Sequence, residues 1–159
     1  MAYSFVAGQF GLLAVLLLWH PPHRWVLPAS VLTAVWLVGV LGAVWLALGL
    51  VSLGRSLTAL PLPVVHGELR TGGLYRLSRH PIYTGLLALA WSSAVRAEAP
   101  GPLLLAAALT ALLWVKSAFE ERHLRSAYPG YDGYARRVPR FLPFGRRLRP
   151  ARSAMGPKL

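Results

Sequence analysis

Residues 29–53 read ASVLTAVWLVGVLGAVWLALGLVSL, a stretch of 25 positions without a charged side chain. A helix of this length crosses the roughly 30 Å hydrocarbon layer of a bilayer. The stretch therefore predicts a membrane-spanning helix. Small residues line the contacts between membrane helices, so Gly39, Gly42 and Gly49 predict close packing on one face of this helix.

Three further apolar runs, at about 3–19, 82–95 and 102–119, continue this pattern. The run at 82–95, the third along the chain, is short for a span, so we expect it to begin earlier or to lie against protein. Proline and glycine at 98–102 predict a tight turn, which joins the last two runs into a helical hairpin. We therefore predict an all-α integral membrane bundle with about four transmembrane helices. No Lys or Arg precedes Arg24, so we interpret the first run as a retained span rather than a signal peptide.

The overall composition agrees with a membrane location. The chain has 159 residues, of which 55% are hydrophobic and 14% charged, against about a quarter charged in soluble domains. A net charge of +12 would indicate nucleic acid for a soluble domain. Beside long apolar runs it indicates an anionic membrane surface instead, so we expect no nucleic-acid partner. The absence of cysteine excludes disulfides, thiolate catalysis and cysteine-based metal sites.

Basic residues gather in two segments and so predict the orientation. Four arginines lie in 54–81 and ten Lys or Arg in 120–159, whereas the other two connections between apolar runs hold one arginine each. By the positive-inside rule, both basic segments face the cytoplasm. We expect a multi-pass protein of the cell membrane with both termini in the cytoplasm. Three parts follow: an N-terminal transmembrane hairpin at 1–53, a core at 54–144 and a flexible basic tail at 145–159.

The first candidate site is GGLYRLSRHPIYTG, residues 72–85. Pro81 favours an extended conformation at His80 and a helix that begins at Pro81. That helix would present Tyr83 in its first turn, beside a helix N-terminus that favours negative charge. A simpler interpretation is an interfacial anchor, because tyrosine and arginine commonly lie at the level of the lipid headgroups.

The second candidate site is WVKSAFEERHL, residues 114–124. Lys116 and Glu120 are four residues apart and share a helix face. Carboxylates at the C-terminal end of a membrane helix are unfavourable, which points to function; the alternative is pairing with nearby arginines. Glu120 and His123 have the spacing of di-iron bundles, but the further ligands of such a site are missing, so we predict no metal.

Together these stretches resemble the isoprenylcysteine carboxyl methyltransferase family of integral membrane enzymes. The first matches the family's Gly-x-Tyr…Arg-His-Pro-x-Tyr-x-Gly signature, and FEERHLRSAYPGYDGYARRVPRFLPF (119–144) is similar to its second motif. The resemblance covers about 66–144 and implies S-adenosylmethionine as cofactor. The positions that it implies around the cofactor are His66, Gly67, Glu68, Leu69, Tyr75, His80, Pro81, Tyr83 and Glu120.

The resemblance also implies which residues meet the acceptor. Lys116 stands where eukaryotic members have an arginine that faces the substrate carboxylate, a replacement that keeps the charge but loses the bidentate fork. We expect Lys116 or Arg79 to steer an anionic acceptor, while Glu120 bonds polar groups of the cofactor. The loop 54–81 and a tail helix at about 119–137 would close over the site.

The expected function is methyl transfer from S-adenosylmethionine to a lipophilic acceptor in the membrane, by carboxyl O-methylation or a similar reaction. One alternative is an NADPH-dependent membrane reductase, because sterol reductases have a similar Arg-His-Pro-x-Tyr region, although with many more spans. Another is a non-catalytic protein that binds anionic lipid through its basic tail. The sequence leaves open the acceptor, the choice of O-, N- or S-methylation, and the oligomeric state.

Overall fold

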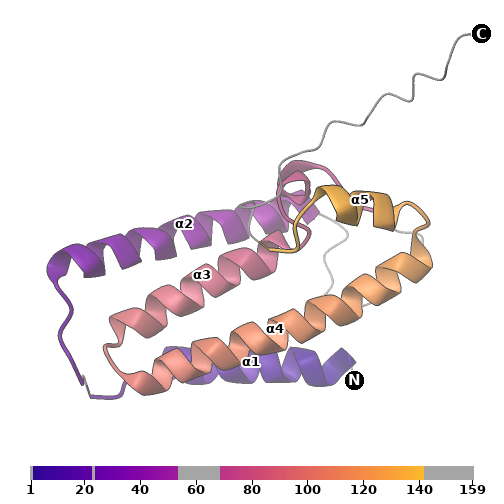
Figure 1. Cartoon of the computed structure of the whole chain (residues 1–159). Coiled ribbons are helices and arrows are strands. Elements are labelled where there is room, and N and C mark those ends of the chain that lie inside the picture. The colour runs from indigo at the N-terminus through magenta and orange to yellow at the C-terminus, as the bar shows by residue number, and fades with distance from the viewer. Residues whose placement is uncertain (1, 23, 54–68, 142–159) are drawn as a thin grey trace, which may run out of the picture.

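The computed structural model describes residues 2–22, 24–53 and 69–141, and all regular secondary structure in these ranges is helical (Figure 1). The predicted all-α class is confirmed. The helices are α1 (Ala2–Leu18), α2 (Ala29–Leu53), the 3-10 helix η2 (Gly73–Arg76), α3 (Pro81–Arg96), α4 (Pro100–Ala127) and α5 (Tyr131–Arg137).

The four longer helices lie side by side, with α3 between α2 and α4 and with α1 along α4 (Figure 1). The first two helices therefore do not form a separate unit: α1 packs mainly on α4, and α2 packs on α3. The N-terminus, η2 and α5 lie at one end of the bundle (Figure 1). This end is called the η2–α5 end below, and it holds both candidate site segments.

The apolar helices have the lengths and surfaces of a membrane bundle. Both α2 and α4 are long and apolar enough to cross a membrane, whereas α1 and α3 are shorter, at 17 and 16 residues. Large apolar side chains of α2 point outward, as contact with lipid requires; they include Trp36, Leu37, Leu41, Val44 and Val51. This arrangement agrees with the membrane protein predicted from the sequence.

The α2 glycines pack against α3, which confirms the predicted close helix contact. A Cβ added at Gly42 would lie 2.7 Å from the Cβ of Ala88, and one added at Gly85 would lie 2.6 Å from the backbone nitrogen of Leu46. The third apolar run begins at Pro81, one residue before the predicted start, and lies against protein. Its short length is thereby explained, since α2 covers it along its length.

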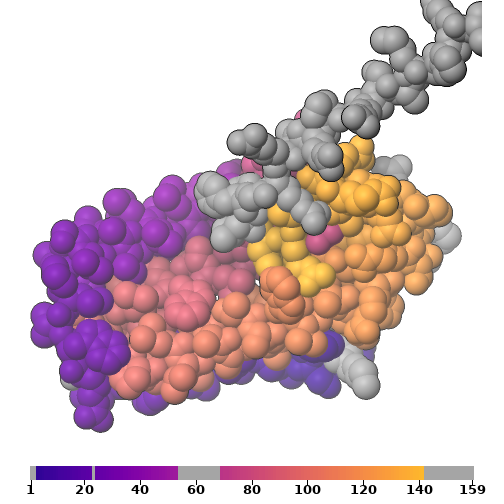
Figure 2. Space-filling view, viewed as in Figure 1, coloured from indigo at the N-terminus to yellow at the C-terminus, as the bar shows by residue number. Residues whose placement is uncertain are grey.

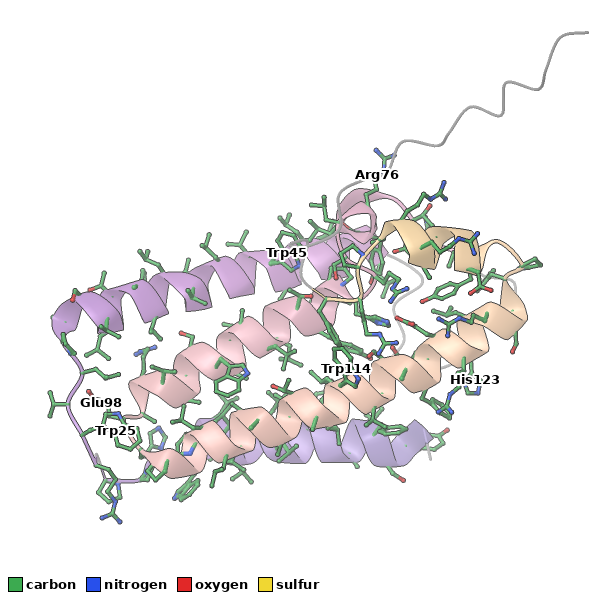
Figure 3. All side chains as sticks on the ribbon, in the orientation of Figure 1. Trp25, Trp45, Arg76, Glu98, Trp114 and His123 are labelled. Carbon is green, nitrogen blue, oxygen red and sulfur yellow. The ribbon has the colours of Figure 1, made fainter. Side chains whose placement is uncertain are left out.

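The far end of the bundle is tied together by Glu98, in the turn between α3 and α4. Its φ of 48° is a left-handed conformation that non-glycine residues rarely adopt. Its carbonyl accepts a hydrogen bond from Arg24 N at 2.8 Å, and its carboxylate accepts one from Leu27 N. Trp25 and Glu98 lie together at this end (Figure 3). The predicted turn thus also anchors the connection between α1 and α2.

The tail helix predicted at about 119–137 is wrong as a single helix. The chain continues in α4 to Ala127, leaves the helix at Tyr128 and begins α5 at Tyr131. Pro129 disfavours a helical conformation at the preceding residue, and Tyr128 has φ −128° and ψ 104°. The break turns the chain back, so that α5 lies across the η2–α5 end (Figure 1).

Part of the predicted closing loop lies outside the described residues. Positions 54–68, with His66, Gly67 and Glu68, and the tail at 145–159 belong to this part. The described part of the site therefore begins at Leu69 and includes the helices.

Candidate functional site

His80 lies between two carboxylates at the η2–α5 end. Its Nδ1 is 3.5 Å from Glu120 Oε2, and its Nε2 is 3.3 Å from Glu121 Oε1. The residue is buried and non-helical, with φ −128°, immediately before the Pro81 that begins α3. As expected from the sequence, proline sets the helix start and thereby directs the imidazole toward the end of α4.

Tyr83 connects the same histidine to Glu120. The Tyr83 hydroxyl donates a hydrogen bond of 2.6 Å to Glu120 Oε1. Its ring is parallel to that of His80, with 5.4 Å between centroids and 2° between planes. The side chain of Glu120 is 16% exposed. The structure thus brings together three of the predicted site residues, His80, Tyr83 and Glu120, which are called the His80–Tyr83–Glu120 cluster below.

Lys116 approaches the other face of this arrangement from one turn earlier in α4. Its Nζ donates to Gln9 Oε1 at 2.8 Å and lies 5.1 Å from the centroid of the Tyr83 ring. Among the described residues, no carboxylate lies within 4.0 Å of this ammonium. Tyr83 therefore contacts Glu120 through its hydroxyl and Lys116 through its ring.

Glu121, unlike its neighbour Glu120, forms ion pairs with arginines. It is fully buried, and Arg140 reaches both of its oxygens, with Nε and Nη2 each 3.0 Å away. Arg79 Nη2 lies at 3.1 Å, and the half-exposed Arg125 at 3.4 Å. The alternative interpretation of the acidic pair, that it pairs with arginines, therefore holds for Glu121. The hydrogen bonds and ion pairs of Arg79 join it to Glu121 and to the carbonyl of Ala135, at 3.1 Å.

The segment after α5, residues 138–141, crosses the start of α3 and is called the strap. Arg79 N donates to Pro139 O at 2.9 Å, and His80 N donates to Arg140 O at 3.0 Å. Two buried hydroxyl groups donate to carbonyls of the same segment, those of Ser78 and Thr84. Phe141 then packs 6.0 Å from the ring of His80. In Figure 2 the yellow atoms of this part of the chain lie directly on α4.

Tyr75 secures α5 to the site. Its carbonyl accepts a 2.6 Å hydrogen bond from the hydroxyl of Tyr134, and Leu69 packs against the small core around Tyr131 and Tyr134. Burial, with a contribution from Glu120, raises the pKa of Tyr75 to about 12. Burial likewise raises the pKa of Tyr131 and of Tyr134. These phenols are therefore neutral at ordinary pH.

Three residues of this site were missed by the sequence reasoning, namely Gln9, Glu121 and Arg140. The signals for two of them were weak. Glu121 adjoins Glu120, which the sequence does not distinguish from it by type or position, and Arg140 is one of many arginines in the tail. Gln9 had a clearer signal, since it is the only carboxamide side chain in the chain. Within the described ranges, no group of three or more His, Asp or Glu side chains is placed to hold a metal ion.

Comparison with known proteins gives the chain a family. A family model described as phospholipid methyltransferase matches residues 33–130, more than half of the chain. The matched range contains most of α2, all of α3 and α4, and with them the whole His80–Tyr83–Glu120 cluster. It excludes α1 and the strap.

Named relatives agree with the family model. Methanethiol S-methyltransferase 2 of Bradyrhizobium diazoefficiens is 41% identical over 91 residues, which are 55% of this chain and 34% of that protein. Protein-S-isoprenylcysteine O-methyltransferase B of Arabidopsis thaliana is 31% identical over 113 residues, 66% of this chain and 55% of that protein. The cobalt-zinc-cadmium resistance protein CzcN of Cupriavidus metallidurans is 34% identical over 100 residues, 62% of this chain and 46% of that protein.

The chain thus matches about a third to about half of the length of these curated relatives. No solved structure matches it significantly.

Proposed function

Since this chain belongs to the phospholipid methyltransferase family, we propose that it is a membrane methyltransferase that uses S-adenosylmethionine. The acceptor would be a lipophilic molecule that partitions into the bilayer. The observation that carries the proposal is the His80–Tyr83–Glu120 cluster, which lies at the end of an apolar bundle and inside the matched range. Two relatives support it, because they are named as methyltransferases of methanethiol and of protein isoprenylcysteine.

The cluster fits the groups that S-adenosylmethionine presents. Glu120 is partly exposed and forms no ion pair with arginine among the described residues, so it can accept hydrogen bonds from an ammonium or from ribose hydroxyls. The rings of His80 and Tyr83 stack on each other, and Phe141 and Lys116 lie against their outer sides, so they would border an adenine or a sulfonium through their edges. Tyr75, Pro81 and Leu69 would complete the cofactor site, with His66, Gly67 and Glu68 as predicted from the sequence.

When bound, S-adenosylmethionine supplies a methyl group that its sulfonium has already activated. The protein then contributes position and the exclusion of water. Glu120 would hold the polar part of the cofactor, and the strap would hold His80 in place. Lys116 would bind an anionic group of the acceptor, which enters from the apolar side of the bundle. We propose carboxyl O-methylation, the reaction named for the Arabidopsis relative, with S-methylation as the second candidate.

The same proposal sets the protein in the membrane. All four longer helices would cross the bilayer, with the η2–α5 end and both termini in the cytoplasm. The position of the N-terminus and α5 at one end supports this topology (Figure 1), as does the cluster of basic residues in 120–159. In this orientation a soluble cofactor reaches the cluster from the cytoplasm and a lipophilic acceptor reaches it from the bilayer.

Calorimetric titration of S-adenosylmethionine into the full chain in lipid nanodiscs tests the proposal. We expect saturable binding by the wild type and its loss in Glu120→Gln and His80→Ala. The matched controls are Glu98→Gln, in the turn between α3 and α4, and His20→Ala, in the exposed connection between α1 and α2. They change the same residue types outside the cluster and should bind normally. A folded wild type that binds NADPH instead would support the reductase. Binding of neither would contradict the proposed function.

A further inference from the structure

Gln9 is a polar residue at an unusual position. It lies in the middle of α1, whose sequence AYSFVAGQFGLLAVLLL is otherwise almost entirely apolar, and it is the only carboxamide side chain in the chain. It also lies before the range that the family model matches. A polar side chain within an apolar membrane helix is costly and marks a functional position.

The partner of Gln9 fixes the orientation of its amide. An ammonium can only donate hydrogen bonds, so the Gln9 oxygen must face Lys116 Nζ, 2.8 Å away. The amide NH2 group therefore points elsewhere, and it has no hydrogen-bond partner in the part of the chain that the structure describes. The side chain is only partly buried, so this donor remains available to a ligand.

Among the described residues, Lys116 forms no ion pair within 4.0 Å, although the carboxylate of Glu120 acts on it from farther away. Lys116 is 3% exposed, and its ammonium contacts the Gln9 oxygen and the face of the Tyr83 ring. The nearest acids are otherwise engaged: Glu120 with Tyr83 and His80, and Glu121 with the arginines. A buried ammonium without a carboxylate in direct contact favours an anion from outside the protein.

We propose that Gln9 determines acceptor specificity: its NH2 group and the Lys116 ammonium form a two-donor clamp for one anionic oxygen or sulfur of the acceptor. This inference rests on the proposed function and assigns to it a residue of α1. The contacts between α1 and α4 set the clamp's position, because Phe5 packs 5.7 Å from Phe119 and a Cβ on Gly8 would lie 3.1 Å from Leu112. Acceptor choice would then depend on a helix outside the matched range.

The test measures methyl transfer from labelled S-adenosylmethionine to three eight-carbon probes, namely octanethiol, octanoate and octylamine. The full chain in nanodiscs is compared with Gln9→Leu, Gln9→Glu and the control Ser4→Ala, which removes an exposed hydroxyl from the same helix. We expect the wild type to use the thiol or the carboxylate in preference to the amine. Loss of one hydrogen bond to a charged group should raise the acceptor KM of Gln9→Leu about tenfold, with kcat changed by less than about twofold.

Gln9→Glu supplies the sharper outcome. Its carboxylate would pair with Lys116 and repel an acceptor anion. We therefore expect kcat/KM to fall by about a hundredfold or more, which corresponds to the energetic cost of placing two like charges together. Binding of S-adenosylmethionine should be unchanged in both variants. A purely structural role for Gln9 would instead lower the folded fraction and the binding stoichiometry while leaving KM alone.

The outcomes separate this inference from the proposed function. Failure of the wild type to bind S-adenosylmethionine counts against the function itself. Normal binding together with an unchanged KM in Gln9→Leu, a preference for octylamine, or transfer to none of the probes overturns the clamp and leaves the function standing.

Discussion

Glu121→Gln should destabilise the protein strongly, because this carboxylate joins three parts of the η2–α5 end: α4, the residues before α3 and the strap. The fully buried side chain holds Arg140 by two contacts of 3.0 Å, Arg79 by one of 3.1 Å and His80 by one of 3.3 Å. Glutamine has the same shape, but it removes the negative charge and turns an NH2 group toward one of these donors. Arg79 and Arg140 would then be cations with 12% and 22% exposed side chains and no carboxylate between them.

The magnitude follows from those contacts. Removing one partner of a buried ion pair costs about 3–5 kcal/mol. We take about 3 kcal/mol, because glutamine keeps one acceptor oxygen, and we give no weight to Arg125, whose side chain is 41% exposed. For a chain of this length, that loss lowers Tm by roughly 6–12 °C.

Thermal unfolding in detergent, followed by circular dichroism, checks this value with Glu120→Gln as the matched control. Glutamine at 120 can still accept the Tyr83 hydroxyl, so its Tm should fall by no more than about 3 °C, as for the loss of about 1 kcal/mol. Calorimetry should show the opposite order, with cofactor binding more sensitive to Glu120→Gln. Equal Tm values for the two variants would refute the division of roles between the adjacent glutamates.

Three further predictions concern packing and ionisation. Gly85→Ala should lower stability by about 2–3 kcal/mol, because its Cβ would lie 2.6 Å from the backbone of Leu46. The control Gly11→Ala, with nothing within 4 Å of the added Cβ, should be neutral or stabilising by up to about 1 kcal/mol. Thermal unfolding measures both variants, and equal Tm values would contradict the α2–α3 contact. Tyr134→Phe should cost about 1 kcal/mol in urea unfolding by removing the hydrogen bond to the Tyr75 carbonyl, and an unchanged midpoint would oppose this. Burial raises the pKa of Tyr75 to about 12 in the folded state, against 10.0 for the free phenol. Between these pH values the folded state keeps the phenol proton that the unfolded state has lost, so stability falls as pH rises through this window. Tyr75→Phe should make this fall in stability shallower, and a pH profile of stability identical to that of the wild type would contradict the prediction.

Local signals in the sequence were sufficient for most helix boundaries. The uncharged run predicted α2 at Ala29–Leu53, and Pro81 predicted the start of α3 to within one residue. These features depend on length, apolarity and proline, which act over a few residues. The break after Ala127 was missed, although Pro129 is a local signal for it.

The candidate site was less predictable, because its contacts join residues far apart in the sequence. Proximity of the segments around His80 and Glu120 followed from the hairpin of the last two apolar runs. The contact between Gln9 and Lys116 did not, since it spans 107 positions and depends on how α1 lies along α4. Which glutamate would meet the arginines was also beyond local reasoning, because it depends on the strap that brings Arg140 to the start of α3.

The adjacent glutamates explain how an uncompensated carboxylate persists in a chain with a net charge of +12. Successive residues on a helix point about 100° apart, so Glu120 and Glu121 face different neighbours. Glu121 faces the loop and the strap, where it engages Arg79 and Arg140. With those guanidinium groups occupied, Glu120 is left to Tyr83 and His80 and stays open to a cationic ligand. The ion pairs of Glu121 with arginine are therefore a condition for the proposed binding role of Glu120. If the carboxylate of Glu121 is lost, we expect an arginine to pair with Glu120 instead.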